Sequence, residues 1–107
     1  MFTYYTYILS NFTRTVLYIG VTNNLQTRVW QHRNGEGGVF TSKYKCFNLL
    51  YYEEFVDINE AIAREKNLKN WRREWKNNLI KQQNPELKDL AADWFKNDGV
   101  DAETSSA

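Results

Sequence analysis

The sequence predicts a small α+β domain, in which a three-stranded antiparallel sheet is flanked by helices in the order β-β-α-β-α-α-α. Two observations carry this prediction: three segments have the composition of strands, and the segments between and after them carry helix signals. The chain has 107 residues, of which 42% are hydrophobic and 16% aromatic, which is enough apolar material for one core. We therefore expect one domain over residues 1–96 and a disordered acidic tail over residues 97–107.

The strands are expected over residues 4–10, 16–21 and 47–55, which are rich in aromatic and aliphatic side chains. The polar residues 11–15 between the first two segments fit a hairpin loop. The first two strands should therefore pair with each other in an antiparallel arrangement.

The first helix is predicted over residues 25–33, because Thr22-Asn23-Asn24 is a typical helix start. Residues 34–38 hold three glycines in five positions, which should end this helix in a flexible loop. We expect that loop, over residues 35–45, to flank a substrate.

The second helical stretch should run over residues 58–83 with a break near Asn70, since Asp57 and Glu60 form a variant of the capping box. Asn84-Pro85 has the pattern of an N-cap followed by proline at the first helical position. This pattern predicts a last helix that ends near Phe95.

Several classes of protein are excluded by the bulk sequence. No apolar run approaches the roughly 20 residues of a membrane helix, and no signal peptide is visible at the N-terminus. Cys46 is the only cysteine and His32 the only histidine, which excludes an internal disulfide and a metal site built from cysteines or a histidine cluster. We expect a cytoplasmic setting, and any metal should be a hard cation bound by carboxylate.

The net charge of +1 hides an asymmetry along the chain. Residues 1–83 hold 12 basic and 7 acidic side chains, whereas residues 84–107 hold 2 basic and 6 acidic ones. A basic body with an acidic C-terminal segment favours a polyanionic partner for the body.

Charged and titratable side chains lie on the apolar faces of two predicted helices. Arg28 and His32 share a stripe with Leu25 and Val29, and Glu65 lies within an apolar stripe of the next helix. A carboxylate in such a place is costly unless it is paired or bound to a metal. From spacing alone, Arg28 and Glu65 fit a structural ion pair equally well, and His32 fits a packed histidine.

Other polar positions also have structural explanations. Tyr7 and Tyr18 alternate within strands in the manner of packing residues, and the N-cap role explains Asn84. None of these residues carries a function by itself.

The motifs gain meaning in combination. They read Y-T-Y-I-L over residues 5–9, L-Y-I-G-V-T over 17–22 and N-L-x-x-R-x-x-x-H over 24–32, followed by Y-Y-E over 51–53, A-I-A-R-E-K over 61–66 and N-P-E over 84–86. From residue 4 to about residue 95, the chain resembles the GIY-YIG nuclease domain. The resemblance is to its small stand-alone bacterial members, which are related to the N-terminal nuclease domain of the excinuclease. The first motif here lacks the glycine of that family.

This resemblance implies a metal-dependent endonuclease that hydrolyses DNA phosphodiester bonds, with a possible role in repair. The residues that match the family's site are Tyr7, Tyr18, Gly20, Arg28, His32, Glu65 and Asn84. Glu65 would hold one Mg²⁺ or Mn²⁺ ion and Arg28 would contact the phosphate. The two tyrosines would face the attacking water, with the choice of base left open, while His32 would assist proton transfer or bind phosphate. Gly20 would let the backbone approach the substrate.

The helical stretch after residue 63 is strongly basic, and it interleaves cations with Trp71 and Trp75. These tryptophans fit either base stacking or core packing. We expect six cations to contact nucleic acid, namely Lys43, Lys45, Lys69, Arg72, Arg73 and Lys76.

Two other functions compete with the nuclease. One is a non-catalytic nucleic-acid-binding module that keeps the nuclease fold. The other is a protein-interaction domain that uses the predicted last helix, with Leu87, Leu90, Ala91, Trp94 and Phe95. We expect a monomer or a weak homodimer, and a domain this short leaves room for a partner protein that supplies specificity.

Overall fold

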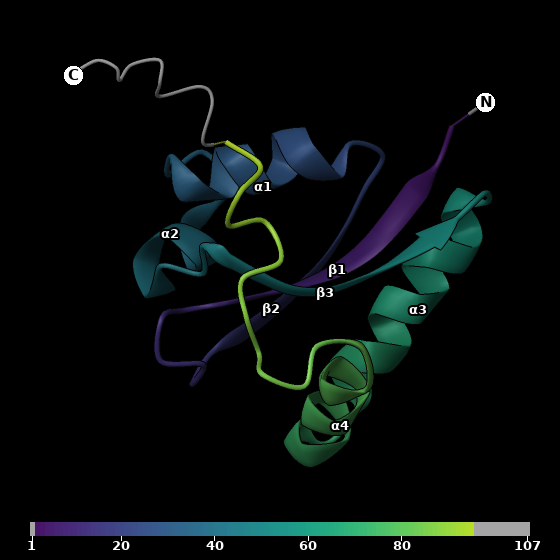
Figure 1. Cartoon of the computed structure of the whole chain (residues 1–107). Coiled ribbons are helices and arrows are strands. Elements are labelled where there is room, and N and C mark those ends of the chain that lie inside the picture. Colours follow the sequence, from purple (N-terminus) through teal and green to yellow (C-terminus); the bar gives the residue numbers. More distant parts are fainter. Residues whose placement is uncertain (1, 96–107) are drawn as a thin grey trace.

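The computed structural model describes residues 2–95, so the predicted acidic tail over residues 97–107 lies outside the described part of the chain. A single antiparallel sheet organises the fold (Figure 1). Its strands are β1 (Tyr4–Ser10), β2 (Leu17–Thr22) and β3 (Asn48–Phe55), and they lie in the order β2-β1-β3. The predicted α+β fold class and its three-stranded antiparallel sheet are confirmed.

Both neighbours of the central strand are antiparallel to it. Tyr7 of β1 lies opposite Gly20 of β2 on one side and Tyr52 of β3 on the other. The register with β3 shifts between Ile8 and Leu9. Because β2 is paired on one side only, its outer edge is open to other elements, and this edge becomes important below.

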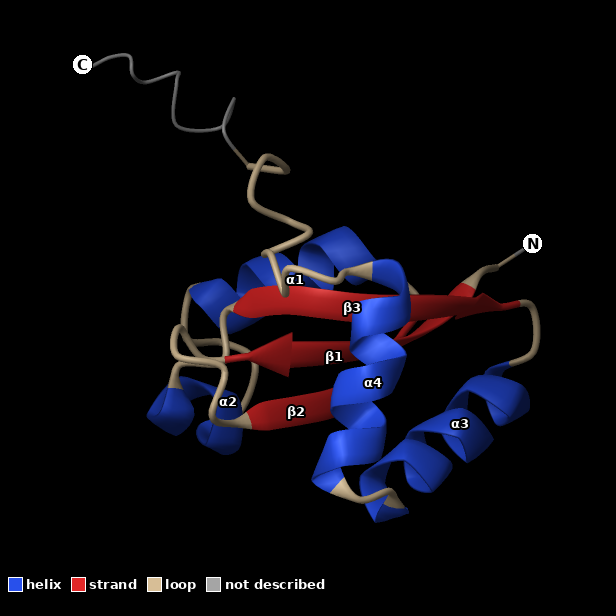
Figure 2. Ribbon diagram, turned by 60° about the horizontal axis from the view of Figure 1, so that its bottom comes forward, coloured by secondary structure: helices blue, strands red, loops and turns tan. Residues whose placement is uncertain are grey.

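Four helices within residues 2–95 cover the sheet. Helices α1 (Leu25–Arg33) and α2 (Val39–Tyr44) lie on one side, and α4 (Arg73–Gln83) crosses the other side (Figure 2). Helix α3 (Ile58–Asn70) contacts β1, β2 and β3 and ends close to the start of α4. The predicted break near Asn70 is confirmed. Within residues 2–95, no helix combines the length and the apolar character that crossing a membrane requires.

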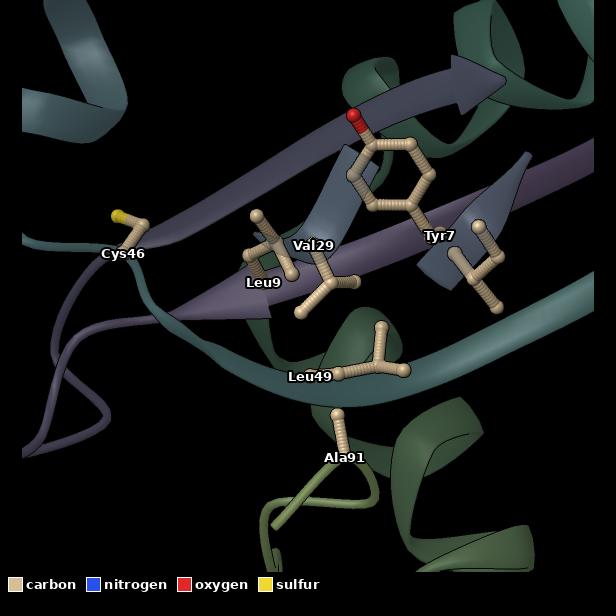
Figure 3. Packing of buried hydrophobic residues seen from close by; sticks show 7 residues of the cluster. Tyr7, Leu9, Val29, Cys46, Leu49 and Ala91 are labelled. Atoms are coloured by element: carbon tan, nitrogen blue, oxygen red, sulfur yellow. The ribbon is translucent and has the colours of Figure 1, made fainter. Parts of the chain in front are cut away.

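The alternation of side chains along the strands produces a core on each face of the sheet. Tyr7, Leu9 and Leu49 pack with Leu25 and Val29 of α1 on one face (Figure 3). Ile8, Ile19 and Leu50 pack with Leu68 of α3 and Ile80 of α4 on the other. The sheet is therefore buried on both sides, which explains why its strands are nearly continuous apolar runs.

The prediction of a flexible loop over residues 35–45 is wrong in its second half, where α2 forms. The helix begins after Gly38, whose φ is +123°, and it ends at Lys45 in the left-handed conformation. Thr41 faces inward from this single turn and is buried. A six-residue helix shows too few repeats for its period to be visible in the sequence.

The predicted last helix, from Asn84-Pro85 to Phe95, is also wrong, because this segment consists of turns. The observed order of elements is therefore β-β-α-α-β-α-α. The Leu90 N–H donates to the Leu49 carbonyl at 2.7 Å, and the Asp89 carboxylate accepts from the N–H groups of Leu49 and Ala91. Hydrogen bonds to β3 thus replace the intrahelical ones, and tertiary contacts override the local signal.

The apolar residues of this closing segment cover the protein's own core. Ala91 is fully buried, and Leu87, Leu90, Trp94 and Phe95 pack against one or other of the two clusters. The helical interaction face expected from the sequence is therefore not formed.

Candidate active site

The catalytic residues suggested by the resemblance gather at the open edge of β2. Tyr7 and Tyr18 come from the sheet, Arg28 and His32 from α1, and Glu65 from α3. The charges of Arg28 and Glu65 both act on the pKa of the Tyr7 hydroxyl, in opposite directions. Two side chains that are more than 30 residues apart in sequence thus bring a cation and an anion close to one phenol.

Tyr7 reaches this edge by lying across its neighbour. Its cross-strand partner is Gly20, and a Cβ at Gly20 would lie 2.5 Å from the Tyr7 hydroxyl oxygen and 2.6 Å from Cζ. In Figure 3 the Tyr7 ring extends from β1 with its hydroxyl directed away from Leu9 and Val29. We expected Gly20 to let the backbone approach a substrate, but the space above it is occupied by the Tyr7 ring.

A buried hydrogen-bond chain fixes the imidazole of His32. Its Nδ1 lies 2.9 Å from the Thr41 hydroxyl, and its Nε2 lies 3.0 Å from the Tyr7 hydroxyl. The Thr41 hydroxyl donates to the Gly38 carbonyl, so it accepts from Nδ1–H, and Nε2 is left to accept the Tyr7 proton. The network therefore assigns a neutral His32 whose Nε2 accepts the hydrogen bond from the Tyr7 hydroxyl.

Gly37 closes the other side of the imidazole. A Cβ at this position would lie 2.0 Å from His32 Nδ1, so only glycine fits there without a shift of the loop or the ring. His32 is fully buried as a result. This places a packed histidine, which the sequence left as an alternative, in direct contact with the candidate catalytic tyrosine.

Burial keeps both members of this pair neutral. It lowers the pKa of His32 to about 4, and the positive charge of Arg28 acts in the same direction. Burial raises the pKa of Tyr7 to about 12, aided by Tyr18 and the Glu65 carboxylate, while hydrogen bonding and attraction from Arg28 oppose the rise. Near neutral pH the site therefore holds a phenol and an uncharged imidazole.

Arg28 is oriented by its own helix and by the loop that follows. It donates to the Gln31 side chain at 3.1 Å and to the Gly37 carbonyl at 3.3 Å. The alternative of an Arg28–Glu65 ion pair is not realised among the ion pairs of residues 2–95, because Glu65 pairs with Lys69 at 3.1 Å. The carboxylate and the guanidinium therefore stay separate at the edge.

Glu65 can supply one ligand to a hard cation. Its side chain is 20% exposed, and its partner Lys69 is an exposed side chain that can turn to solvent. The described residues contain no group of three or more acidic, histidine or cysteine side chains that could hold a metal ion. A cation at Glu65 would therefore depend on water and substrate oxygens for its other ligands, as Mg²⁺ commonly does.

Tyr18 lines the outer part of the site and is half-buried. Its ring centroid lies 5.4 Å from that of His32 and 6.3 Å from that of Tyr7. On its open side the ring borders a cavity of about 340 Å³, which it shares with Phe40, Lys69 and Lys76.

Asn84 is not brought to this edge. It caps the C-terminus of α4 and is buried, and its amide donates to the carbonyls of Leu50 and Lys88 at 3.0 Å and 2.7 Å. The predicted N-cap role is wrong, since residues 85–95 form no helix. Leu50 belongs to β3, which is two strand positions away from β2, so the amide holds the closing segment to the opposite edge of the sheet.

The six cations expected to bind nucleic acid differ in whether their charged groups already have partners within the protein. Lys69 and Lys76 line the cavity beside Tyr18, and burial together with Arg73 lowers the pKa of Lys76. Arg73 instead donates to the carbonyls of Arg14 and Thr15, which ties α4 to the β1–β2 turn.

The remaining cations are partly occupied by aromatic rings. The Arg72 guanidinium lies 5.4 Å from the ring centroid of Trp75, and the Lys43 ammonium lies 5.3 Å from that of Tyr44. Lys45 is exposed at the end of α2. Of the two tryptophans, Trp71 packs against the core, while Trp75 is 47% exposed.

Sequence reasoning missed three residues that complete the site, namely Gly37, Phe40 and Thr41. Each acts through tertiary contact with His32 or Tyr18. The only local signal was the pair of glycines at positions 37 and 38, which we interpreted as flexibility.

Comparison with known proteins gives two kinds of sequence similarity. Residues 3–78 match the model of the GIY-YIG catalytic domain. The chain is also 36% identical over 83 residues to a UPF0213 protein of Oceanobacillus iheyensis, covering 78% of this chain and 95% of that protein. A UPF0213 protein of Bacillus pumilus is 36% identical over 66 residues, which is 62% of this chain and 67% of that one.

A solved structure has a similar fold. The solution NMR structure of a UPF0213 protein from Bacillus halodurans matches with a TM-score of 0.53 at 24% identity. The match covers 85% of this chain and 97% of that chain. At this identity the likeness supports the arrangement of strands and helices alone.

Proposed function

The chain belongs to the GIY-YIG family, and on this premise we propose that it is a metal-dependent endonuclease that hydrolyses phosphodiester bonds in DNA. One observation carries the proposal: the Tyr7 hydroxyl donates to a neutral His32 within reach of the charges of Arg28 and Glu65. The proposal includes kinship with the N-terminal nuclease domain of the excinuclease, a link to DNA repair and a cytoplasmic location.

The chain's own residues suit the proton transfers of hydrolysis. Attack by water on phosphorus requires that the water lose a proton. The Tyr7 oxygen can accept that proton while its own passes along the 3.0 Å hydrogen bond to His32 Nε2. We therefore propose Tyr7 as the base, since it is the tyrosine with a hydrogen-bonded acceptor behind it.

Arg28 favours loss of the proton from Tyr7, whereas the same charge and burial disfavour a proton on His32. A phenolate at Tyr7 is disfavoured by desolvation, but Arg28 stabilises it, and the same guanidinium can donate to a phosphate oxygen. Glu65 would hold the divalent cation, Mg²⁺ or Mn²⁺. When bound, a cation of this class neutralises charge on the phosphate and on the leaving oxygen.

The test is nicking of flapped or branched DNA in the presence of Mg²⁺ or Mn²⁺. We expect Glu65→Ala to lose at least 100-fold in rate, about the loss found for one electrostatic group of a catalytic site. Glu60→Ala is the matched control, because Glu60 is an exposed glutamate in the first turn of the same helix. Equal cleavage by the wild type and Glu65→Ala would refute the proposed endonuclease activity.

A second function, a non-catalytic nucleic-acid-binding module, is favoured by one contact. Lys69 neutralises Glu65 at 3.1 Å, as it would in a binding surface that needs no metal. This function predicts salt-dependent binding of DNA that Arg72→Ala weakens, with no cleavage in either metal.

A further inference from the structure

The outer face of α2 carries an exposed aromatic pair beside the candidate active site. Phe40 and Tyr44, one helical turn apart, are 45% and 41% exposed, with ring centroids 4.8 Å apart. Phe40 also lies 6.0 Å from Tyr18, with the two ring planes inclined by 32°. Three rings thus lead from the buried site to the surface.

The fully buried residue of α2 is not a member of this pair. Thr41 is the buried residue of the helix, and it faces His32 through a 2.9 Å hydrogen bond. The aromatic rings lie on the outer side and leave more than two fifths of each side chain open to solvent. Exposure of large rings carries a cost in water that a ligand with a flat apolar face would remove.

The charge around the rings identifies the ligand class. Phe40 and Tyr18 line the cavity of about 340 Å³ together with Lys69 and Lys76, which come from α3 and α4. Flat rings flanked by two ammonium groups fit a nucleobase and its phosphate better than they fit an apolar protein surface, which would offer no anion to Lys76.

We propose that Phe40, backed by Tyr44, stacks on an unpaired nucleobase next to the phosphate at the active site, with Lys69 and Lys76 on the neighbouring backbone. Inside a duplex both faces of a base are covered by its neighbours, so a protein ring can stack only on a base at an end, in a flap or in a single strand. The substrate class is therefore nucleic acid with unpaired nucleotides at the cleavage position. The link to cleavage rests on the proposed function, whereas the stacking itself does not.

The experiment measures binding in EDTA, so that cleavage cannot interfere. Fluorescence anisotropy compares a single strand, a flap and a blunt duplex of equal length, with DNA and RNA versions of the single strand. We expect Phe40→Ala to weaken binding of the single strand and the flap about 5- to 150-fold, the range for one stacked base, and to change duplex binding less than 2-fold. The inference concerns the unpaired base, so it is supported whether the DNA or the RNA version of the single strand binds more tightly.

Matched variants separate stacking from folding and from charge. Phe12→Ala removes an equally large exposed ring from the β1–β2 turn and should change nothing, while Phe40→Trp should keep the affinity for unpaired strands. Lys76→Ala should weaken all three ligands alike and lower the salt slope by about one. A 2-aminopurine base in the single strand should be quenched by the wild type and not by Phe40→Ala.

The inference is overturned if Phe40→Ala weakens duplex and single strand equally, or if its effect does not exceed that of Phe12→Ala. The proposed function fails separately, if Glu65→Ala and the wild type cleave alike. Selective binding of unpaired strands without cleavage would support the stacking site and refute the nuclease activity.

Discussion

Gly20→Ala tests the placement of Tyr7 directly. In an ordinary strand, replacing glycine by alanine stabilises the fold by about 0.5–1 kcal/mol, because the unfolded chain loses freedom. Here the added methyl group would lie 2.5 Å from the Tyr7 hydroxyl oxygen, 2.6 Å from Cζ and 3.1 Å from Tyr18 Cε2. The structure therefore predicts the opposite sign.

The magnitude follows from what must move. The Tyr7 ring is buried and cannot turn to solvent, so the overpacking should cost about 1–3 kcal/mol. Displacement of the ring would also break its hydrogen bond to His32, which adds about 1 kcal/mol. For a domain of this size, a total of about 2–4 kcal/mol lowers the melting temperature by roughly 10–25 °C.

Thermal unfolding followed by circular dichroism measures this effect, and a matched background gives the control. In Tyr7→Leu the ring is absent, so Gly20→Ala should then be neutral or stabilising, and the two substitutions should be strongly non-additive. A melting temperature of Gly20→Ala equal to or above that of the wild type would show that Tyr7 does not lie across β2. Activity should fall as well, because the relay from Tyr7 to His32 is broken.

Three further predictions concern the network and the closing segment. Thr41→Val keeps the shape of the side chain but leaves His32 Nδ1–H without an acceptor, so urea denaturation should show a loss of about 1–3 kcal/mol that Thr41→Ser largely avoids. Because the pKa of His32 falls to about 4 on folding, the unfolded chain binds more protons than the folded one between pH 6.5 and 4. The free energy of unfolding should therefore be highest above pH 6.5 and fall by about 3 kcal/mol towards pH 4. His32→Gln should flatten this pH profile. An NMR titration midpoint of His32 near 6.5 would contradict that expectation. Asp89→Ala removes the acceptor of two backbone N–H groups and the ion-pair partner of Arg33, and it should cost about 2–4 kcal/mol by urea denaturation, against little change for the exposed Glu86→Ala.

Much of this protein could be predicted from local sequence. The strands follow from runs of aromatic and aliphatic residues, and α1 and α3 follow from Asn24 and Asp57, whose side chains accept hydrogen bonds from the first helical turn. Each of these signals acts over a few neighbouring residues, so it can be recognised without the fold. The site residues Tyr7, Arg28, His32 and Glu65 were likewise selected from the sequence, through the resemblance of its motifs to those of the GIY-YIG domain.

Only the tertiary structure decided how those residues meet. The Asn84-Pro85 signal for a helix was overridden because Leu49 of β3 offered its backbone groups to Leu90 and Asp89. Helix α2 is tied to α1 by the hydrogen bond between Thr41 and His32, a contact that the periodicity of the sequence does not predict.

The same division holds for the site. Sequence alone determined the basic body, the three strands, the helices α1, α3 and α4, and the set of chemical groups. The fold decided that Tyr7 lies across Gly20, that its proton faces His32, and that Phe40 and Lys76 border one cavity. The physical reason is that propensity and capping are short-range, whereas the space that a side chain fills and the partner it meets depend on strands and helices brought together by burial.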